Sequence, residues 1–140
     1  MESKAYAIWK GSLKDGSGVI TTGSKVLSAV PYTFKTRFEG ATGTNPEELI
    51  ASAHSACFSM ALSAELGKAS IVPDKIETNA TVKLEQKDGG FSVTESKLVT
   101  SVIAPNADKA AIELAAASAK ENCPISKLLN AKINLSLQIN

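Results

Sequence analysis

A long helical pattern in the middle of the chain constrains the fold more than any other feature of the sequence. Residues 44–48 read Thr-Asn-Pro-Glu-Glu, which places a polar cap, a first-turn proline and two carboxylates at the positive end of a helix dipole. We expect Asn45 to be the cap and the helix to run to about Leu66, before a stop at Gly67. Its apolar residues at helical spacing are Leu49, Ile50, Ala53, Ala56, Cys57, Met60, Ala61 and Ala64. Because most of them are small, we expect a second helix to pack closely against this stripe.

Short apolar runs before this helix predict strands. Residues 6–10, 19–22 and 32–38 are separated by glycine-containing turns, which is typical of an antiparallel meander. Lys35 and Arg37 would then share one face of the third strand, because side chains two residues apart point to the same side of a strand.

The second half of the chain predicts a hairpin, another helix and a final strand. Residues 76–85 alternate between apolar and polar, and a turn at residues 87–90 leads into a return strand whose phase changes near Glu95 and Ser96, which indicates a bulge. A helix capped by Asn106 follows, and the chain ends in a further alternating segment.

The composition fits one soluble domain. A chain of 140 residues with 44% apolar and 21% charged residues is long enough to bury a core, so we expect a single α+β domain over residues 1–140. The net charge of +1 and the lack of a basic block argue against a nucleic-acid partner. We find no signal peptide and no apolar run of membrane-spanning length, so we expect a cytoplasmic protein with no membrane partner.

The two cysteines pose the main functional question, because they lie in different predicted elements. Cys57 is inside the long helix, and Cys123 directly precedes Pro124 at the start of a further short helix. Such a pair reacts together only if the fold brings the sulfurs within disulfide reach, and in a reducing cytosol a working disulfide is transient and catalytic. The alternative is that both are small buried hydrophobes without a chemical role. The sequence has no CxxC motif and no Cys/His cluster at metal-ligand spacing, which argues against zinc.

Activation of Cys57 requires a neighbouring cation. A thiol with a pKa of about 8.5 is mostly protonated at neutral pH, and only the thiolate attacks a peroxide oxygen. Cys57 lies eleven residues past Pro46, roughly 16 Å along the axis, so the dipole of its own helix cannot lower its pKa. Arg37 is the best candidate because its guanidinium stays charged and offers five donors, although a solvated strand arginine is the simpler interpretation.

Glu47 is the expected partner of Arg37 through a bidentate pair, although its place in the first helical turn explains it equally well. Glu47 precedes Cys57 by ten residues, roughly 15 Å on one straight helix, so one arginine cannot comfortably contact both. We therefore hypothesise a two-fold homodimer in which long helices lie side by side and each site is completed across the interface.

Cys123 and His54 have separate expected roles. A residue before proline is pushed out of helical geometry, so Cys123 should lie near exposed amides and be accessible. That placement suits a resolving thiol, which attacks a sulfenic acid and closes a disulfide. His54 is one turn before Cys57 and could act as a base, but a single histidine is more often a packed residue.

Four segments share a distinctive set of motifs: RFEG at residues 37–40, TNPEELI at 44–50, AHSACFSMAL at 53–62 and NCPIS at 122–126. Together they resemble the OsmC/Ohr family of thiol-dependent hydroperoxide reductases, and they are most similar to its OsmC (osmotically inducible protein C) branch. The likeness spans essentially the whole chain. Ser55 stands where the pattern usually carries alanine, which a face of small residues should tolerate.

The resemblance implies an OsmC-like α+β fold, with antiparallel sheets packed around long central helices in an intertwined homodimer whose sites lie at the subunit interface. It implies a peroxidase that reduces organic hydroperoxides and hydrogen peroxide in oxidative or osmotic stress. By the same similarity, Cys57 is the peroxidatic nucleophile, Cys123 the resolving cysteine, Arg37 the thiolate activator and Glu47 its partner. An external dithiol, of lipoyl type by resemblance to Ohr, would reduce the resulting disulfide, with no metal, flavin or haem cofactor.

Two other functions would use the same residues. A non-catalytic, stress-related binding protein on the same scaffold would hold its thiols too far apart to cycle, since fold does not guarantee chemistry. A general thiol–disulfide oxidoreductase would reduce protein disulfides faster than peroxides. The presence of both cysteines together with Arg37 and Glu47 favours the peroxidase.

Overall fold

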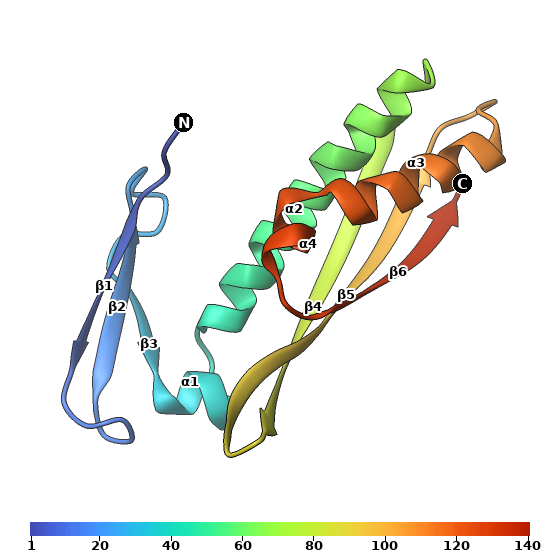
Figure 1. Cartoon of the computed structure of the whole chain (residues 1–140). Coiled ribbons are helices and arrows are strands. Elements are labelled where there is room, and N and C mark those ends of the chain that lie inside the picture. Colours follow the sequence, from blue (N-terminus) through green and yellow to red (C-terminus); the bar gives the residue numbers. More distant parts are fainter. The chain divides into compact units, whose positions relative to one another are not determined.

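The computed structural model describes residues 1–140, and the chain divides into two compact units, Met1–Leu49 and Ile50–Asn140 (Figure 1). Each unit contains one three-stranded sheet. The long helix α2 (Pro46–Lys68) begins in the first unit and continues in the second. That the whole chain forms one domain stays a prediction.

The first unit is the predicted antiparallel meander followed by a short helix. Strands β1 (Ala5–Lys10), β2 (Ser17–Thr22) and β3 (Val30–Thr33) pair in the order β1-β2-β3 and are drawn in blue in Figure 1. Helix α1 (Phe34–Phe38) follows directly. Helix α1 carries Arg37, one of the predicted site residues.

The expectation that residues 32–38 form one strand is wrong beyond Thr33. The Thr33 hydroxyl accepts from the backbone N–H of Thr36 at 3.2 Å, and the Thr36 hydroxyl accepts from the N–H of Thr33 at 3.0 Å. This reciprocal capping box starts a helix where β-branched residues had indicated a strand. Arg37 therefore lies on a helix, and Lys35 does not share its face, because residues two apart diverge on a helix.

Helix α2 begins as predicted. The Asn45 side-chain oxygen accepts from the backbone N–H of Glu48 at 2.8 Å, which confirms Asn45 as the cap. The helix passes through Gly67 and ends one residue later, at Lys68.

The packed stripe of α2 differs from the predicted one. Its fully buried residues are spaced four apart: His54, Phe58, Leu62 and Leu66. Cys57 is only partly buried, and the exposed residues include Ala53, Ala56, Met60 and Ala64. The large side chains face the core of the second unit because they remove more apolar surface from water than alanine does, so the alanines lie on the side of the helix away from that core.

The second unit is built around the predicted hairpin of β4 (Lys75–Lys87) and β5 (Gly90–Ile103). Asp88 and Gly89 form its turn with φ values of 52° and 82°, which is the two-residue turn that matches strand twist. The pairing of β4 with β5 shifts its register between Lys83 and Leu84 of β4. This shift is the β-bulge that the sequence predicted for the hairpin.

One pairing of the second sheet is parallel, whereas only antiparallel sheets were expected. Strand β6 (Lys132–Ile139) lies beside β5 in the parallel sense, because α3 (Lys109–Asn122) and α4 (Pro124–Leu128) carry the chain back along the sheet. The cap of α3 is Asp108, two residues after the predicted Asn106, which instead adopts a left-handed φ of 64°.

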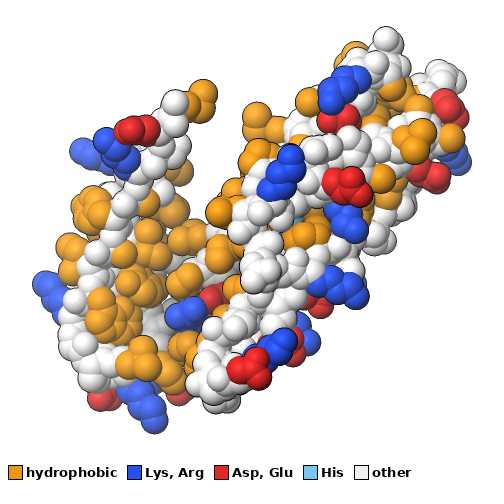
Figure 2. All heavy atoms as spheres, in the orientation of Figure 1, with side chains coloured by type: hydrophobic (Ala, Val, Ile, Leu, Met, Phe, Trp, Pro, Cys, Tyr) orange, Lys and Arg blue, Asp and Glu red, His pale blue; other side chains and the backbone are white.

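The apolar core belongs to the second unit. Its buried residues come from α2, β5, α3 and the segments that follow them: Phe58, Leu62, Leu66, Leu98, Val102, Ala104, Ile112, Ala115, Ala116, Ala119 and Cys123. In the first unit only Gly18 and Thr21 are buried. Figure 2 shows hydrophobic side chains gathered over the sheet of the first unit, and Tyr6 is 61% exposed there.

Helix α2 is long and apolar enough, by length and composition, to cross a membrane. The sequence had led us to expect no apolar segment of that length. The Phe58, Leu62 and Leu66 side chains of α2 instead pack in the core of the second unit. A core helix of a soluble protein passes the same test, so this property is weak support for a membrane partner.

Candidate active site

The two cysteines lie together in the second unit. The thiol of Cys123 donates to the sulfur of Cys57 over a distance of 3.1 Å between the two sulfurs, and both are free thiols. A disulfide needs a separation of about 2.05 Å, so a movement of about 1 Å would join them. The long helix and the α3–α4 junction therefore place the pair within reach of disulfide chemistry.

Cys123 is positioned by the helix junction that its sequence predicts. Its backbone N–H donates to the carbonyl of Ala119 at 2.8 Å and ends α3, and Pro124 begins α4. The expectation of an accessible thiol is wrong, because Cys123 is fully buried and packs in the apolar core. Only Cys57 is partly exposed, so only Cys57 can meet a substrate from solvent.

The pKa of Cys57 is raised in the second unit. Burial is the largest cause, and the hydrogen bond with the Cys123 thiol adds to it. The backbone N–H of Ile125 acts in the opposite sense and lowers the pKa. None of these contacts supplies a full positive charge. A cation is therefore still needed to lower the pKa of Cys57, as the sequence indicated.

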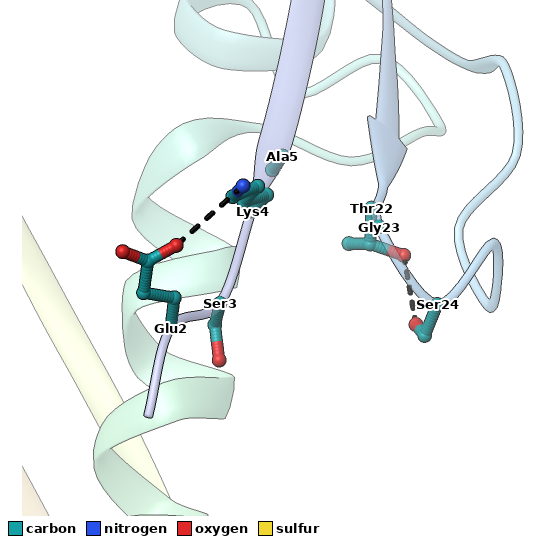
Figure 3. A pocket seen from close by; sticks show the side chains of 7 residues that line it. All are labelled: Glu2, Ser3, Lys4, Ala5, Thr22, Gly23 and Ser24. Carbon is teal, nitrogen blue, oxygen red and sulfur yellow. Dashed lines mark hydrogen bonds and ion pairs between the residues drawn. The ribbon is translucent and has the colours of Figure 1, made fainter.

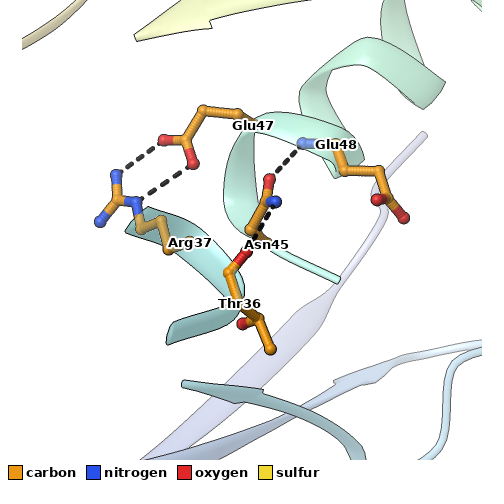
Figure 4. A network of polar contacts seen from close by, with 5 residues as sticks. All are labelled: Thr36, Arg37, Asn45, Glu47 and Glu48. Carbon is orange, nitrogen blue, oxygen red and sulfur yellow. Dashed lines mark hydrogen bonds and ion pairs between the residues drawn. The ribbon is translucent and has the colours of Figure 1, made fainter. Parts of the chain in front are cut away.

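Arg37 and Glu47 form the second candidate group, which lies in the first unit (Figure 4). The Nε atom of Arg37 donates to Glu47 Oε2 at 3.1 Å, and Nη2 donates to Oε1 at 2.7 Å. The Arg37 guanidinium also lies 5.1 Å from the ring centre of Phe38. The bidentate pair predicted from the sequence is present, and it fixes the plane of the guanidinium.

The start of α2 holds this pair in place. The side-chain amide of Asn45 donates to the carbonyl of Thr36 at 3.3 Å, while its oxygen caps α2 (Figure 4). One residue thus ties the helix that carries Arg37 to the helix turn that carries Glu47. The Arg37 side chain remains 34% exposed and that of Glu47 12%, so the arginine keeps an open side.

A cavity of 250 Å³ adjoins Arg37 within the first unit. Its lining is aromatic and apolar apart from Arg37 and Thr33: Trp9, Leu13, Tyr32, Phe34, Phe38 and Pro46. Gly18 supports one wall, because a Cβ there would lie 2.5 Å from the Tyr32 ring. The arrangement suits an apolar group next to a hydrogen-bond donor.

Other parts of the molecule offer less chemistry. A hollow at the start of β1 contains a solvated Glu2–Lys4 ion pair at 3.5 Å and the hydroxyls of Thr22 and Ser24 (Figure 3). Both charged side chains there are about four-fifths exposed, at 81% and 78%, so their interaction is weak. No group of three or more His, Cys, Asp and Glu side chains is placed to hold a metal ion.

Comparison with known proteins identifies the family. The model of the family described as OsmC-like protein matches residues 39–138. Peroxiredoxin OsmC of Escherichia coli (strain K12) is 46% identical over 139 residues, which cover 99% of this chain and 97% of that protein. The chain belongs to the OsmC family. As an OsmC-family member it is a thiol-dependent peroxidase, and its chemistry is carried by cysteine.

Solved structures of the OsmC/Ohr group share the fold. The organic hydroperoxide resistance protein OhrB of Bacillus subtilis matches with a TM-score of 0.73 and 28% identity over 98% of both chains. The organic hydroperoxide resistance protein of Elizabethkingia anophelis matches with a TM-score of 0.78 and 25% identity over 100% of this chain and 99% of that one. The predicted OsmC-like α+β fold class is confirmed.

One contributor to this OsmC site was missed by sequence reasoning. The N–H of Ile125 faces Cys57, and the signal was present in the Cys-Pro-Ile order, because a proline at the first helical position leaves the next amides unpaired. His54 is the packed residue that the sequence favoured over a base, because it is buried and both its ring nitrogens bond serine hydroxyls. The cysteine pair is fixed in one unit and the Arg37–Glu47 pair in the other.

Proposed function

We propose that this protein reduces organic hydroperoxides and hydrogen peroxide to the alcohol or water, in defence against oxidative or osmotic stress. Cys57 is the peroxidatic nucleophile and Cys123 the resolving cysteine. The observation that carries this proposal is the 3.1 Å contact between a partly exposed sulfur and a buried one. An exposed thiol can meet the peroxide, and a buried neighbour can resolve the product without meeting it.

The cycle balances with cysteine chemistry alone. The Cys57 thiolate attacks one peroxide oxygen, the O–O bond breaks, and the alkoxide leaves and takes up a proton to give the alcohol. The sulfenic acid on Cys57 is then attacked by the Cys123 sulfur, which forms the disulfide and releases water. An external dithiol, of lipoyl type by resemblance to Ohr, reduces the disulfide and is itself oxidised.

Arg37 is the proposed activator of the Cys57 thiolate, and Glu47 is its partner. The contacts in the second unit raise the pKa of Cys57, so the reaction needs a cation to hold the thiolate at neutral pH. Arg37 fits this role because Glu47 fixes its plane by two hydrogen bonds while the guanidinium stays partly open.

The functional form is proposed to be a homodimer with sites completed across the interface. Support comes from apolar surface that this chain leaves uncovered: Met60 of α2 is 75% exposed, and Tyr6 and Ile8 of β1 are 61% and 45% exposed. A second copy would cover such surfaces by self-complementary contacts. The proposed location is the cytoplasm, where reduced dithiols are available.

The substrate is proposed to include hydroperoxides with an apolar group. The cavity beside Arg37 would take the apolar group, and the guanidinium would bond a peroxide oxygen. Hydrogen peroxide lacks the apolar group, so it should react with a higher KM than cumene hydroperoxide.

The test is a count of free thiols before and after one equivalent of cumene hydroperoxide. The proposal predicts loss of both thiols in the wild type. In Cys123→Ser it predicts one rapid turnover followed by a stall, with overoxidation only when further hydroperoxide is added. An unchanged thiol count would identify a binding protein instead. Faster reduction of insulin disulfides than of cumene hydroperoxide would identify a general thiol–disulfide oxidoreductase.

A further inference from the structure

His54 is a fully buried polar side chain that the proposed cycle does not use. Its Nδ1 atom lies 2.7 Å from the hydroxyl oxygen of Ser96, and its Nε2 atom lies 2.9 Å from that of Ser126. The imidazole comes from α2, Ser96 from β5 and Ser126 from α4. One ring therefore joins the long helix, the sheet and the short helix next to Cys123.

The cluster of His54, Ser96 and Ser126 leaves no ring nitrogen without a hydrogen-bond partner, and the loss of either bond would lower stability. A serine hydroxyl can donate or accept, so each tautomer of the neutral ring finds two partners. Burial lowers the pKa of His54, which favours the neutral ring. Removal of either hydroxyl would leave a ring nitrogen without a partner in a low-dielectric interior.

The consequence for the cysteine pair follows from what α4 carries. The helix has only five residues; Ser126 is its buried residue, while Lys127 and Leu128 are exposed. Cys123 precedes it directly, and the N–H that lowers the pKa of Cys57 belongs to its Ile125. The His54–Ser126 bond is thus a buried polar attachment of α4 to the helix that carries Cys57.

We propose that His54 is a positioning residue that acts through Ser126 to hold Cys123 against Cys57. The inference rests on the proposed function, because it concerns the step in which the Cys123 sulfur attacks the Cys57 sulfenic acid. In that step the S–S bond forms, the S–O bond breaks, and the leaving hydroxide takes a proton to give water. A loose α4 would slow this step, since small misplacements of reacting groups are costly.

The chain offers a matched pair of variants for the test. Ser126→Ala removes the hydroxyl on α4, and Ser96→Ala removes the hydroxyl on the sheet from the same ring. Each protein is mixed with an excess of cumene hydroperoxide, which supplies the second equivalent that sulfinic acid formation consumes. The reaction is quenched with an alkylating reagent at timed intervals and measured by intact mass. The masses separate thiol, sulfenic acid, disulfide and sulfinic acid.

We expect Ser126→Ala to slow disulfide closure by about tenfold or more and to accumulate sulfinic acid, while sulfenic acid forms within about threefold of the wild-type rate. Ser96→Ala should close its disulfide within about threefold of the wild type, even where urea unfolding shows it to be the less stable variant. Ser126→Thr, which keeps the hydroxyl, should restore closure. Equal closure rates in Ser126→Ala and Ser96→Ala, whether fast or slow, would overturn the proposal.

A second measurement separates this inference from the proposed function. Oxidised glutathione forms a mixed disulfide on Cys57, which Cys123 resolves by the same approach of sulfurs without any peroxide. Slower resolution in Ser126→Ala alone supports the positioning role even if the wild type fails to reduce hydroperoxides. Resolution at the wild-type rate in all variants contradicts it.

Discussion

The two units of this chain each hold a pair of functional groups, but they hold them in different ways. In the second unit the Cys57–Cys123 contact is surrounded by a packed apolar core. In the first unit only Gly18 and Thr21 are buried, and the Arg37–Glu47 pair is held mainly by polar contacts. The difference teaches that one chain fixes the distance between its sulfurs by core packing, whereas the unit that carries Arg37 leaves apolar side chains such as Tyr6 and Ile8 exposed.

The largest expected effect tests the core-held pair. Cys57→Ser removes the proposed nucleophile, so hydroperoxide turnover should fall by more than about a thousandfold, to the uncatalysed rate. The measurement is consumption of cumene hydroperoxide with dihydrolipoamide as reductant. If Cys57→Ser retained turnover and the separate variant Cys123→Ser lost it, the roles of the two cysteines would be exchanged.

The next effect tests the other pair. Arg37→Lys keeps the charge but loses the planar fork, so the second-order rate of sulfenic acid formation should fall by about ten- to hundredfold. The pKa of Cys57, followed by the pH dependence of iodoacetamide alkylation, should rise in parallel. Lys35→Ala is the matched control on the same helix and should leave both values unchanged. A wild-type rate in Arg37→Lys would rule out the activator role.

A stability measurement compares the units directly. Leu62→Ala creates a cavity in the core of the second unit and should lower the free energy of unfolding by about 2 to 5 kcal/mol at every protein concentration. Tyr6→Ser in the first unit should instead weaken association, so that its effect on urea unfolding is largest in concentrated protein and disappears on dilution, when both proteins are monomers. An effect of Tyr6→Ser that stays within about 0.5 kcal/mol throughout would mean that no second copy covers this sheet.

The smallest effect concerns pH. Because burial lowers the pKa of His54, the unfolded chain takes up a proton before the folded one does as pH falls below about 6.5. Stability should therefore decrease from pH 7 towards pH 5, with a slope of at most one proton from this residue. Urea unfolding of His54→Gln should lack this part of the slope. An identical pH dependence in both proteins would mean that His54 does not titrate on unfolding in this range.

Local chemistry made much of the fold predictable. Asn45 caps α2 because a short polar side chain before proline and two glutamates has few other structural uses. The hairpin turn at Asp88 and Gly89 followed from a sequence that favours positive φ. The Arg37–Glu47 pair was predictable because complementary charged groups flank a short loop.

Long-range packing accounts for what the sequence did not reveal. The parallel pairing of β5 with β6 depends on how α3 and α4 return the chain, which an alternating pattern does not encode. Burial of Cys123 and the serine partners of His54 arise from segments 42 to 72 residues apart. At Thr33 a local motif competed with strand propensity, and the reciprocal threonine bonds prevailed.

The 3.1 Å contact between the sulfurs joins positions that are 66 residues apart in the chain. A disulfide there would close a loop of nearly half the polypeptide and, through lost freedom of the denatured ensemble, favour the folded state by about 4 kcal/mol. Oxidation would then act as reversible reinforcement. The protein would resist heat and proteolysis best while oxidant is plentiful and reductant scarce. It would lose this added stability once the disulfide is reduced.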